Sequence, residues 1–502
     1  MQGSVPAIPC LIMPSLTTVQ STSPALPGGM APMSTPRKRL MALIVASLML
    51  MEQLDGTALT TALPAIAHDF HVGIPATSIT LTVYMLGLAA LIPASGYMAE
   101  RFGSRLTLRW AIGLFLSGSL ICARAHSLPV LAIARLVQGA GGAMMVPVGR
   151  LVILRSVAKA ELLSIMAWVM LPATIGPMAG PVLGGVLTSW LSWRWIFYIN
   201  IPLGLLAIVL TGRFIPQIRT TRPPPFDLKG NILSATALGG LIFGMELLGH
   251  GQTARLAGIG LGLLAPMAAL AYIRHARGTA HPVLDLSLLR IPTFRVSVLA
   301  GGLTRIATAG TIFLLPSLLQ VRFGASAAQS GLVTFLAPMG ALAMRLVVSH
   351  AYRGLGFRRV MCAGSLALPG MCLLLALLRP GTIPDWLLLL LAFNGMGQTL
   401  LFTGYNTIAY ADMPAARMSA ATSLYATCQQ TMLTLGICMA AAMLGMAQAL
   451  LPPPWRLHDY SVAFIACGVV AVGALPLLLR LSPDAGASVS GHGGPKNANK
   501  SK

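Results

Sequence analysis

The sequence predicts an all-α membrane protein that crosses the bilayer fourteen times, and three observations lead to this prediction. Of its 502 residues, 56% are hydrophobic and only 9% are charged, whereas soluble proteins carry charge on about a quarter of their residues. Many apolar runs approach the roughly 20 residues that cross a bilayer core as a helix. These runs do not alternate apolar and polar residues as transmembrane β-strands do, so helices are expected.

The predicted spans are fourteen apolar segments whose short connections leave no room for a soluble domain. They cover residues 41–66, 77–98, 106–123, 128–149, 162–190, 196–212, 230–249, 256–273, 296–320, 327–349, 360–378, 384–410, 418–447 and 459–479. Pro and Gly inside such segments are tolerated where neighbouring helices satisfy the backbone groups that they free. We therefore keep the interrupted segments as single spans.

The Lys and Arg residues predict the orientation of these spans, because cytoplasmic connections carry an excess of both. With fourteen spans, 25 of the 34 Lys and Arg residues fall on the side of the N-terminus and six fall on the other side. The remaining three, Arg135, Arg305 and Arg345, lie within spans. Both termini are therefore expected in the cytoplasm. The formal charge of +22 is spread over these connections, so we expect no nucleic-acid partner.

The two ends of the sequence and the cysteines predict no further domain or metal site. Residues 1–36 are rich in Pro, Ser and Thr, and Met33 precedes the basic residues before the first span. We interpret 1–36 as disordered or as an over-extended gene start, and the Gly-, Ser- and Lys-rich residues 482–502 as a disordered tail. The seven cysteines show no metal-ligand spacing, so they are expected to pack as small apolar residues, and we predict neither a metal nor a cofactor.

Five motifs in the first half of the chain resemble those of one transporter family. They are Leu54-Asp55-Gly56-Thr57 followed by Ala62-Leu63-Pro64 in the first span, Gly96-Tyr-Met-Ala-Glu100-Arg101-Phe-Gly103-Ser-Arg105 after the second, Arg135-Leu-Val-Gln138-Gly139 in the fourth, Gly176-Pro177-Met-Ala-Gly180-Pro181-Val-Leu-Gly184-Gly185 in the fifth and Trp193-Arg194-Trp195-Ile-Phe197-Tyr-Ile-Asn200-Ile-Pro202 entering the sixth. Together they resemble the fourteen-helix drug:proton antiporters of the major facilitator superfamily. The segment from Gly141 to Leu151 is similar to their multidrug-resistance D-type branch.

This resemblance implies a major facilitator fold with two six-helix bundles, at 37–216 and 293–481. Residues 217–292 would then hold linkers and two accessory helices. It further implies multidrug efflux by solute:proton antiport through alternating access, in the inner membrane of a bacterium and by a single chain. Its partners would be a small-molecule substrate, protons and the lipid bilayer. A membrane enzyme or receptor is the rival class, but the sequence shows no catalytic constellation or receptor domain.

Three residues are predicted to couple proton movement to transport. Asp55 lies about fifteen residues into the first span, where an ionised carboxylate is costly, so it should face the bundle interior. It could carry a proton or make only a structural hydrogen bond. Glu52 lies on a similar helix face and could share the proton with Asp55 or pair with a base on another helix. Arg135 needs carboxylate or carbonyl partners at midspan, and could take part in coupling or simply join two helices.

Gln138 and Arg305 are predicted to line the substrate cavity. Family resemblance favours lipophilic, often cationic drugs, whereas Arg305 in the first helix of the second half could meet an anion or form a structural ion pair. An exporter of a physiological organic anion or metal chelate is therefore the alternative. Glu246, near the outer end of the seventh span, has no assigned role.

The remaining candidate residues belong to the two conformational motifs, the loop after the second span and the fifth span. The loop residues are Gly96, Glu100, Arg101, Gly103 and Arg105, where Glu100 stands for the Asp that the family carries and Ser104 for a basic residue. The second motif comprises Gly176, Pro177, Gly180, Pro181, Gly184 and Gly185. Glycines four residues apart give one flat helix face for close packing, and this face could seal the cavity or only pack.

Overall fold

The computed structural model is helical throughout the residues that it describes. These are residues 35–72, 77, 79–169, 172–219, 225–248, 252–325, 327–378, 384–450, 458–483 and 485–486. Almost all of the N-terminal segment 1–36 and most of the tail 482–502 lie outside them. The described residues include no strand.

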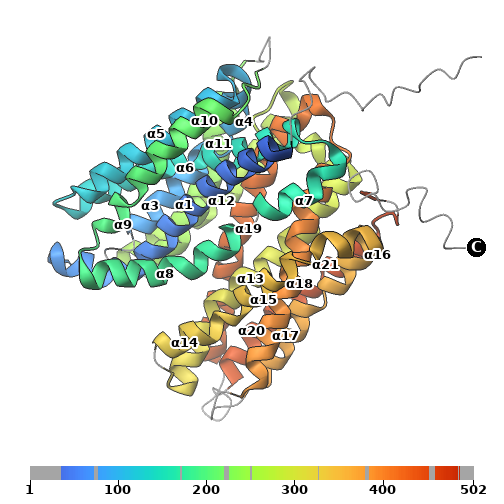
Figure 1. The fold of residues 1–502 in the computed structure, drawn as a ribbon. Coiled ribbons are helices and arrows are strands. Elements are labelled where there is room, and N and C mark those ends of the chain that lie inside the picture. Colours follow the sequence, from blue (N-terminus) through green and yellow to red (C-terminus); the bar gives the residue numbers. More distant parts are fainter. Residues whose placement is uncertain are drawn as a thin grey trace, which may run out of the picture.

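The helices of the first half run from blue to green in Figure 1, and most of them lie together on one side of the molecule, whereas the helix of residues 159–169 lies against the second half. They are α1 (Thr35–Asp69), α3 (Ile79–Leu91), α4 (Ser95–Phe102), α5 (Ser104–Ala123), α6 (Leu128–Ser156), α7 (Lys159–Val169), α8 (Pro172–Trp190), α9 (Trp195–Tyr198) and α10 (Asn200–Phe214). Two helices follow them, α11 (Leu228–Leu248) and α12 (Gln252–Gly278). These two pack on each other, and α11 also packs on α3.

The second half, yellow to red in Figure 1, begins after the 3-10 helix η1 (Leu286–Arg290). Its elements are α13 (Pro292–Phe323), α14 (Ala327–Thr334), α15 (Leu336–Arg345), α16 (Val348–Gly364), α17 (Ala367–Ala376), α18 (Trp386–Ile408), η2 (Ala415–Arg417), α19 (Met418–Leu450), α20 (Asp459–Val472) and α21 (Ala474–Leu479). The division into bundles at 37–216 and 293–481 stays a proposal.

Eleven helical segments of the described residues are long and apolar enough to cross a membrane, and α3 with α4, bent by 54°, makes a twelfth. The predicted spans 162–190 and 327–349 are instead built from shorter pieces, α7 with α8 and α14 with α15. Large apolar side chains such as Trp190 and Leu346, 81% and 82% exposed, stand on the surface, as expected for side chains in contact with lipid. The chain is a multi-pass membrane protein, and the figure of fourteen spans stays a prediction.

The buried apolar side chains distinguish the two ends of the molecule. We call the end that holds the α4–α5 turn at Gly103 the Gly103 end, and the end that holds the α8–α9 turn the Trp193 end. At the Gly103 end one continuous core contains side chains of both halves, among them Met41, Leu108 and Leu424. At the Trp193 end each half has a core of its own. The two halves are therefore closed on each other at the Gly103 end.

Candidate functional site

Asp55 lies in the middle of α1 with its carboxylate inside the first half, only 1% exposed. One carboxylate oxygen, Oδ1, accepts hydrogen bonds from Nε2 of Gln138 at 2.8 Å and from Nδ2 of Asn200 at 2.9 Å. The other, Oδ2, forms a salt bridge with Arg135. An ionised carboxylate without water needs such partners, and here α6 and α10 supply them.

Arg135 is fully buried in α6 and has partners on several helices. Besides Asp55, its guanidinium donates to Oε1 of Gln138 at 2.6 Å and to the backbone oxygen of Thr80 at 3.2 Å. The guanidinium carbon lies 4.2 Å from the ring centroid of Tyr84, where the ring face attracts the positive charge. Arg135 therefore ties α1, α3 and α6 together around one carboxylate.

Ser119 of α5 completes this group, which we call the Asp55 network: Asp55, Ser119, Arg135, Gln138 and Asn200. The Ser119 hydroxyl accepts from Nε2 of Gln138 at 2.8 Å and donates to the backbone oxygen of Phe115 at 2.9 Å. All five side chains are at most 2% exposed. Because both oxygens of Asp55 are hydrogen-bonded, protonation of the carboxyl would remove an ion pair and require the network to rearrange. The geometry thus links the charge of Asp55 to the packing of four helices.

Glu52 lies one turn away from Asp55 but outside this network. Its Oε2 atom is buried without a hydrogen-bond partner, as is the hydroxyl of Tyr84. A Cβ atom on Gly142 would lie 3.7 Å from the Glu52 carboxyl carbon and 3.2 Å from the Tyr84 hydroxyl, so both groups face the same part of α6. Among the described residues, no Lys or Arg forms a salt bridge with Glu52. The alternative in which Glu52 pairs with a base on another helix is therefore not seen among the described residues.

The loop motif at the Gly103 end joins the two halves through the backbone of α4. The backbone N–H of Gly96 donates to Oγ of Ser423 at 2.9 Å, and Oγ of Ser419 donates to the Gly96 carbonyl at 2.8 Å. The hydroxyl of Ser95 lies 3.1 Å from that of Ser423. A Cβ on Gly96 would meet the Ser419 backbone oxygen at 2.8 Å. We call these three bonds the serine latch, and only glycine at position 96 permits it.

The charged residues of this motif lie beside the latch. Glu100 faces Arg155 of α6 at 3.8 Å, and Arg155 also donates to the backbone oxygen of Ala415 at 3.2 Å. Nε of Arg105 donates to the Ile215 backbone oxygen at 2.7 Å. Arg101 donates to the hydroxyl of Tyr97 at 3.3 Å, in its own helix. The acid Glu100 thus still finds a basic partner.

Gly103 and Ser104 fix the turn between α4 and α5. Gly103 has a φ of +87°, a backbone conformation that glycine adopts without strain, and a Cβ there would clash with the side chain of Gln217. Ser104 stands where the family carries a basic residue. Its hydroxyl donates to the backbone oxygen of Pro216 at 2.9 Å and accepts from the N–H of Ile218 at 3.0 Å. The motif therefore holds the end of α10 through backbone contacts.

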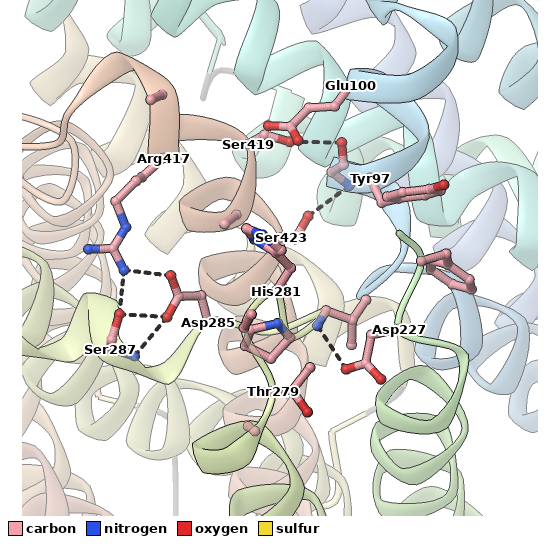
Figure 2. A pocket seen from close by; sticks show the side chains of 18 of the residues that line it. Tyr97, Glu100, Asp227, Thr279, His281, Asp285, Ser287, Arg417, Ser419 and Ser423 are labelled. Atoms are coloured by element: carbon pink, nitrogen blue, oxygen red, sulfur yellow. Dashed lines mark hydrogen bonds and ion pairs between the residues drawn. The ribbon is translucent and has the colours of Figure 1, made fainter. Parts of the chain in front are cut away.

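A cavity of about 1410 Å³ opens beside the latch, between the first half, the segment 279–290 and the start of α19. Figure 2 shows Arg417 directed at Asp285 and Ser287 on one wall and Ser419 and Glu100 on another. Arg417 lies 2.5 Å from Oδ2 of Asp285. Burial alone would raise the pKa of Asp285, but hydrogen bonds from Ser287 and the charge of Arg417 hold this pKa below its usual value. We call this cavity the vestibule.

The glycines of α8 pack on α1 next to Asp55. A Cβ on Gly180 would lie 3.1 Å from the backbone nitrogen of Ala58, and one on Gly184 would lie 2.9 Å from the Ala58 carbonyl carbon. A Cβ on Gly176 would clash with Gln53, whereas Gly185 has open space around it. The side chains of Pro177 and Pro181, like that of Glu246, lie outside the described residues. The gating role of this motif stays a proposal.

The structure brings Asp55, Arg135 and Gln138 together, and it leaves Arg305 in the other half. Gln138, predicted to line the substrate cavity, is fully buried and bonded to Asp55. Arg305 lies on α13 with its guanidinium carbon 4.7 Å from the ring centroid of Phe402. No described carboxylate forms a salt bridge with it, so the predicted structural ion pair is not seen.

Comparison with known proteins identifies the family. The sequence model described as Major Facilitator Superfamily matches residues 45–437, well over half of the chain. The chain belongs to the major facilitator superfamily. It is 36% identical over 409 residues to "Putative multidrug resistance protein MdtD" of Klebsiella pneumoniae (strain 342), covering 80% of this chain and 85% of that protein. The protein of the same name from Salmonella heidelberg (strain SL476) is 36% identical over 411 residues, covering 80% and 86%.

Two solved structures share the fold of this major facilitator protein. One is the human organic anion transporter MFSD10 (TETRAN), with a TM-score of 0.65 and 15% sequence identity over 89% of this chain and 100% of that chain. The other is the proton:xylose symporter XylE bound to 6-bromo-6-deoxy-D-glucose, with a TM-score of 0.63 and 14% identity over 91% and 98%. At this identity the likeness shows the architecture alone. Membership of the superfamily makes the chain a transporter of small molecules.

Sequence reasoning missed two members of the Asp55 network in this major facilitator protein. Asn200 stands in the segment that resembles the family's entry to span six, but nothing local indicates that it reaches Asp55. Ser119 is an ordinary serine within the apolar span 106–123. The one available signal was polarity itself, because a polar side chain inside a span usually faces other protein groups rather than lipid.

Proposed function

We propose that this chain is a proton-coupled secondary exporter of the multidrug-efflux type that works by alternating access. The observation that carries the proposal is the buried salt bridge between Asp55 and Arg135, embedded in a network that spans four helices of one half. The 36% identity to MdtD proteins over 80% of the chain supports export of drug-like solutes. The same relatives, all from Gram-negative bacteria, support the bacterial inner membrane as its location.

The charge pattern supports placing the Gly103 end in the cytoplasm, together with both termini. In that orientation the described conformation is closed toward the cytoplasm by the serine latch. A proton entering from outside would bind Asp55 and neutralise its charge. Arg135 would then lose its ionic partner, and the helices that the pair joins could shift relative to one another. In the inward-facing arrangement Asp55 would release its proton to the cytoplasm, and the Asp55–Arg135 pair would form again as the transporter returns to its first state.

In a transport cycle of this kind, the same protein moves protons inward and solute outward. Protonation of Asp55 and binding of solute would favour different conformations, so that the inward movement of protons drives the outward movement of solute. The family relationship supports transport as opposed to catalysis, and a single chain contains both halves that such a cycle needs. The substrate class that the relatives' names support is that of drugs.

Purified protein in liposomes tests this function directly. An imposed pH gradient should drive accumulation of tetraphenylphosphonium, a lipophilic cation, on the acidic side, and an ionophore that collapses the gradient should abolish it. In the reverse direction, adding the solute to one side should release protons that a pH dye detects. Proton coupling would be contradicted if the flux of each of several cationic and anionic drugs did not depend on the pH gradient.

A further inference from the structure

Two arginines that take no part in the Asp55 network lie near the same tyrosine, Tyr425, between the halves: Arg150 of α6 and Arg305 of α13. Arg150 is only 2% exposed, and Arg305 is partly buried. Each guanidinium stays charged, and such a charge inside a membrane span requires partners. In the described part of the chain, neither forms a salt bridge with any carboxylate.

Tyr425 of α19 lies at the meeting point of these two arginines. The guanidinium carbon of Arg150 lies 5.5 Å from the Tyr425 ring centroid, and the Tyr425 hydroxyl faces Arg305. The ring of Tyr410 stands edge-on to that of Tyr425 with 5.7 Å between centroids, and its hydroxyl faces Arg150. Neither hydroxyl reaches hydrogen-bond geometry. Among the described residues, the guanidinium groups of Arg150 and Arg305 therefore lie next to aromatic side chains and form no salt bridge with a carboxylate.

Five buried polar atoms at this place are left without hydrogen-bond partners, namely two guanidinium nitrogens and three hydroxyl oxygens. They are Nε and Nη1 of Arg150 and the hydroxyls of Ser297, Tyr410 and Tyr425. Ser297, Tyr425 and Arg305 also line a small cavity of about 10 Å³, which has room for one water molecule. Buried donors usually have an acceptor. The three hydroxyls can donate or accept, whereas the two Arg150 N–H groups can only donate. Beside two fixed positive charges, these groups point to an acceptor that is negatively charged.

We propose that Arg150 and Arg305, together with Tyr425, form the recognition point for the carboxylate of a transported aromatic organic anion. This inference rests on the proposed transport function and names a substrate class for it. A guanidinium binds a carboxylate through two parallel hydrogen bonds, and the rings of Phe402 and Tyr425 would contact the apolar body of the anion. One arginine comes from each half, so the anion would be held between the two moving parts.

The described conformation shows this site closed, since a cavity of about 10 Å³ cannot hold an organic anion. The vestibule lies at the Gly103 end, where the halves would part. Its lining includes the basic residues Arg155, Arg219, Arg277, Arg290 and Arg417, which raise the local concentration of anions. Parting of the halves at this end would open a path from the vestibule toward Tyr425.

Binding and transport measured with two probes of opposite charge test the proposal. The probes are salicylate, an aromatic carboxylate, and tetraphenylphosphonium. Binding is followed on purified protein by the rise in melting temperature with probe concentration, and transport by flux in liposomes. The variants are Arg150→Gln, Arg305→Gln, the charge-preserving Arg305→Lys and the ring-preserving Tyr425→Phe. Arg213→Gln is the matched control, because it removes an exposed arginine of α10 that lines neither the proposed site nor the vestibule.

We expect the wild-type protein to bind salicylate, and Arg150→Gln or Arg305→Gln to weaken that binding at least tenfold. Arg305→Lys should weaken it by a smaller factor, because lysine keeps the charge and loses the planar pair of donors. Tyr425→Phe should also weaken it by a smaller factor. The affinity for tetraphenylphosphonium should be unchanged in all four variants, and Arg213→Gln should keep the affinity for salicylate.

Three results would separate the possible failures. Absence of any salicylate binding by the wild-type protein would overturn the anion site. Equal loss of both probes in the arginine variants would also overturn it, because a structural contact between the halves would affect both solutes alike. If the wild-type protein moves neither these probes nor any of several other cationic and anionic drugs across liposomes, the proposed function is wrong, while the melting-temperature titration still decides whether the anion site exists.

Discussion

Arg135 of α6 forms a salt bridge with Asp55 of α1, and neither side chain reaches solvent. Removing one member of a buried pair leaves the other as an uncompensated charge, which is strongly destabilising. Protonation of Asp55 would likewise leave the buried charge of Arg135 uncompensated. Binding of one proton to Asp55 would therefore favour a different arrangement of the helices that the pair joins.

Asp55→Asn should abolish proton-driven export while the protein still reaches the membrane. The amide keeps the size and polarity of the carboxyl and still accepts hydrogen bonds, but it cannot bind and release a proton. Flux driven by a pH gradient in liposomes measures the effect, and solute exchange without a gradient should persist. Asp69→Asn is the matched control at the exposed end of α1, where Asp69 pairs with Arg194. Wild-type coupling in Asp55→Asn would make Asp55 a structural residue and Glu52 the next candidate.

Asn200→Ala should weaken coupled transport about tenfold without changing the location of the protein. Asn200 donates one of the two neutral hydrogen bonds to the Asp55 carboxylate, and a hydrogen bond to a charged group contributes about 1.5–3 kcal/mol. The melting temperature in detergent should fall at the same time. Asn231→Ala is the control, because Asn231 bonds only to a backbone oxygen, that of Ala90, from the accessory helix α11. Equal loss of coupling in both variants would argue against a special role for Asn200.

Gly96→Ala should loosen the contact between the halves at the Gly103 end. The added Cβ would lie 2.6 Å from Oγ of Ser423, so α4 must move away from α19 and the serine latch must break. Hydrogen exchange followed by mass spectrometry should show faster exchange in residues 95–102. Gly113→Ala on α5, where a Cβ meets nothing within 4 Å, should leave exchange there unchanged. Unaltered protection of α4 in Gly96→Ala would show that the latch does not hold the halves together.

The contact between Asp285 and Arg417 should persist across the pH range in which transport is measured. The pKa of Asp285 is held below its usual value, so the carboxylate is ionised throughout the neutral range. The stabilisation that it gives is present above the unfolded-state pKa of about 3.9 and is lost as the pH falls through the lower folded-state value. Both side chains are partly exposed, so we expect only roughly 0.2–1 kcal/mol.

Thermal unfolding of Asp285→Asn and wild type measures that contribution. The difference between the two should be constant from pH 5 to 8 and should shrink below pH 4. Asp385→Asn, at an exposed carboxylate before α18, serves as the control. A difference between Asp285→Asn and wild type that varies between pH 6 and 8 would contradict the lowered pKa.

Reporter fusions should place both termini in the cytoplasm. The basis is the excess of Lys and Arg that keeps its phase through fourteen predicted spans. A reporter that is active only outside the cytoplasm, fused after residue 481, should give no signal, and one active only inside should do so. An external C-terminus would require an odd number of spans and would rule out the fourteen-span arrangement.

The sequence allowed the helical membrane fold and the core of the Asp55 network to be predicted, because charge inside an apolar span is costly and must face protein. It could not predict the break within 327–349, since average hydropathy is the same for a straight helix and for two shorter ones. Asn200 and Ser119 were missed because their contact with Asp55 depends on how α10 and α5 pack. Arg150 was read as a charge on a connecting segment, whereas the structure buries it within α6.

The serine latch bears on how fast this transporter can turn over. Its three bonds join uncharged groups, and each such bond contributes only about 0.5–1.5 kcal/mol net. A proton that moves down a gradient of one pH unit supplies about 1.4 kcal/mol, which is of the same size as one of these bonds. The serine latch can therefore open under the proton gradient of a cell membrane. Because its bonds are individually weak, it can break and form again in every transport cycle.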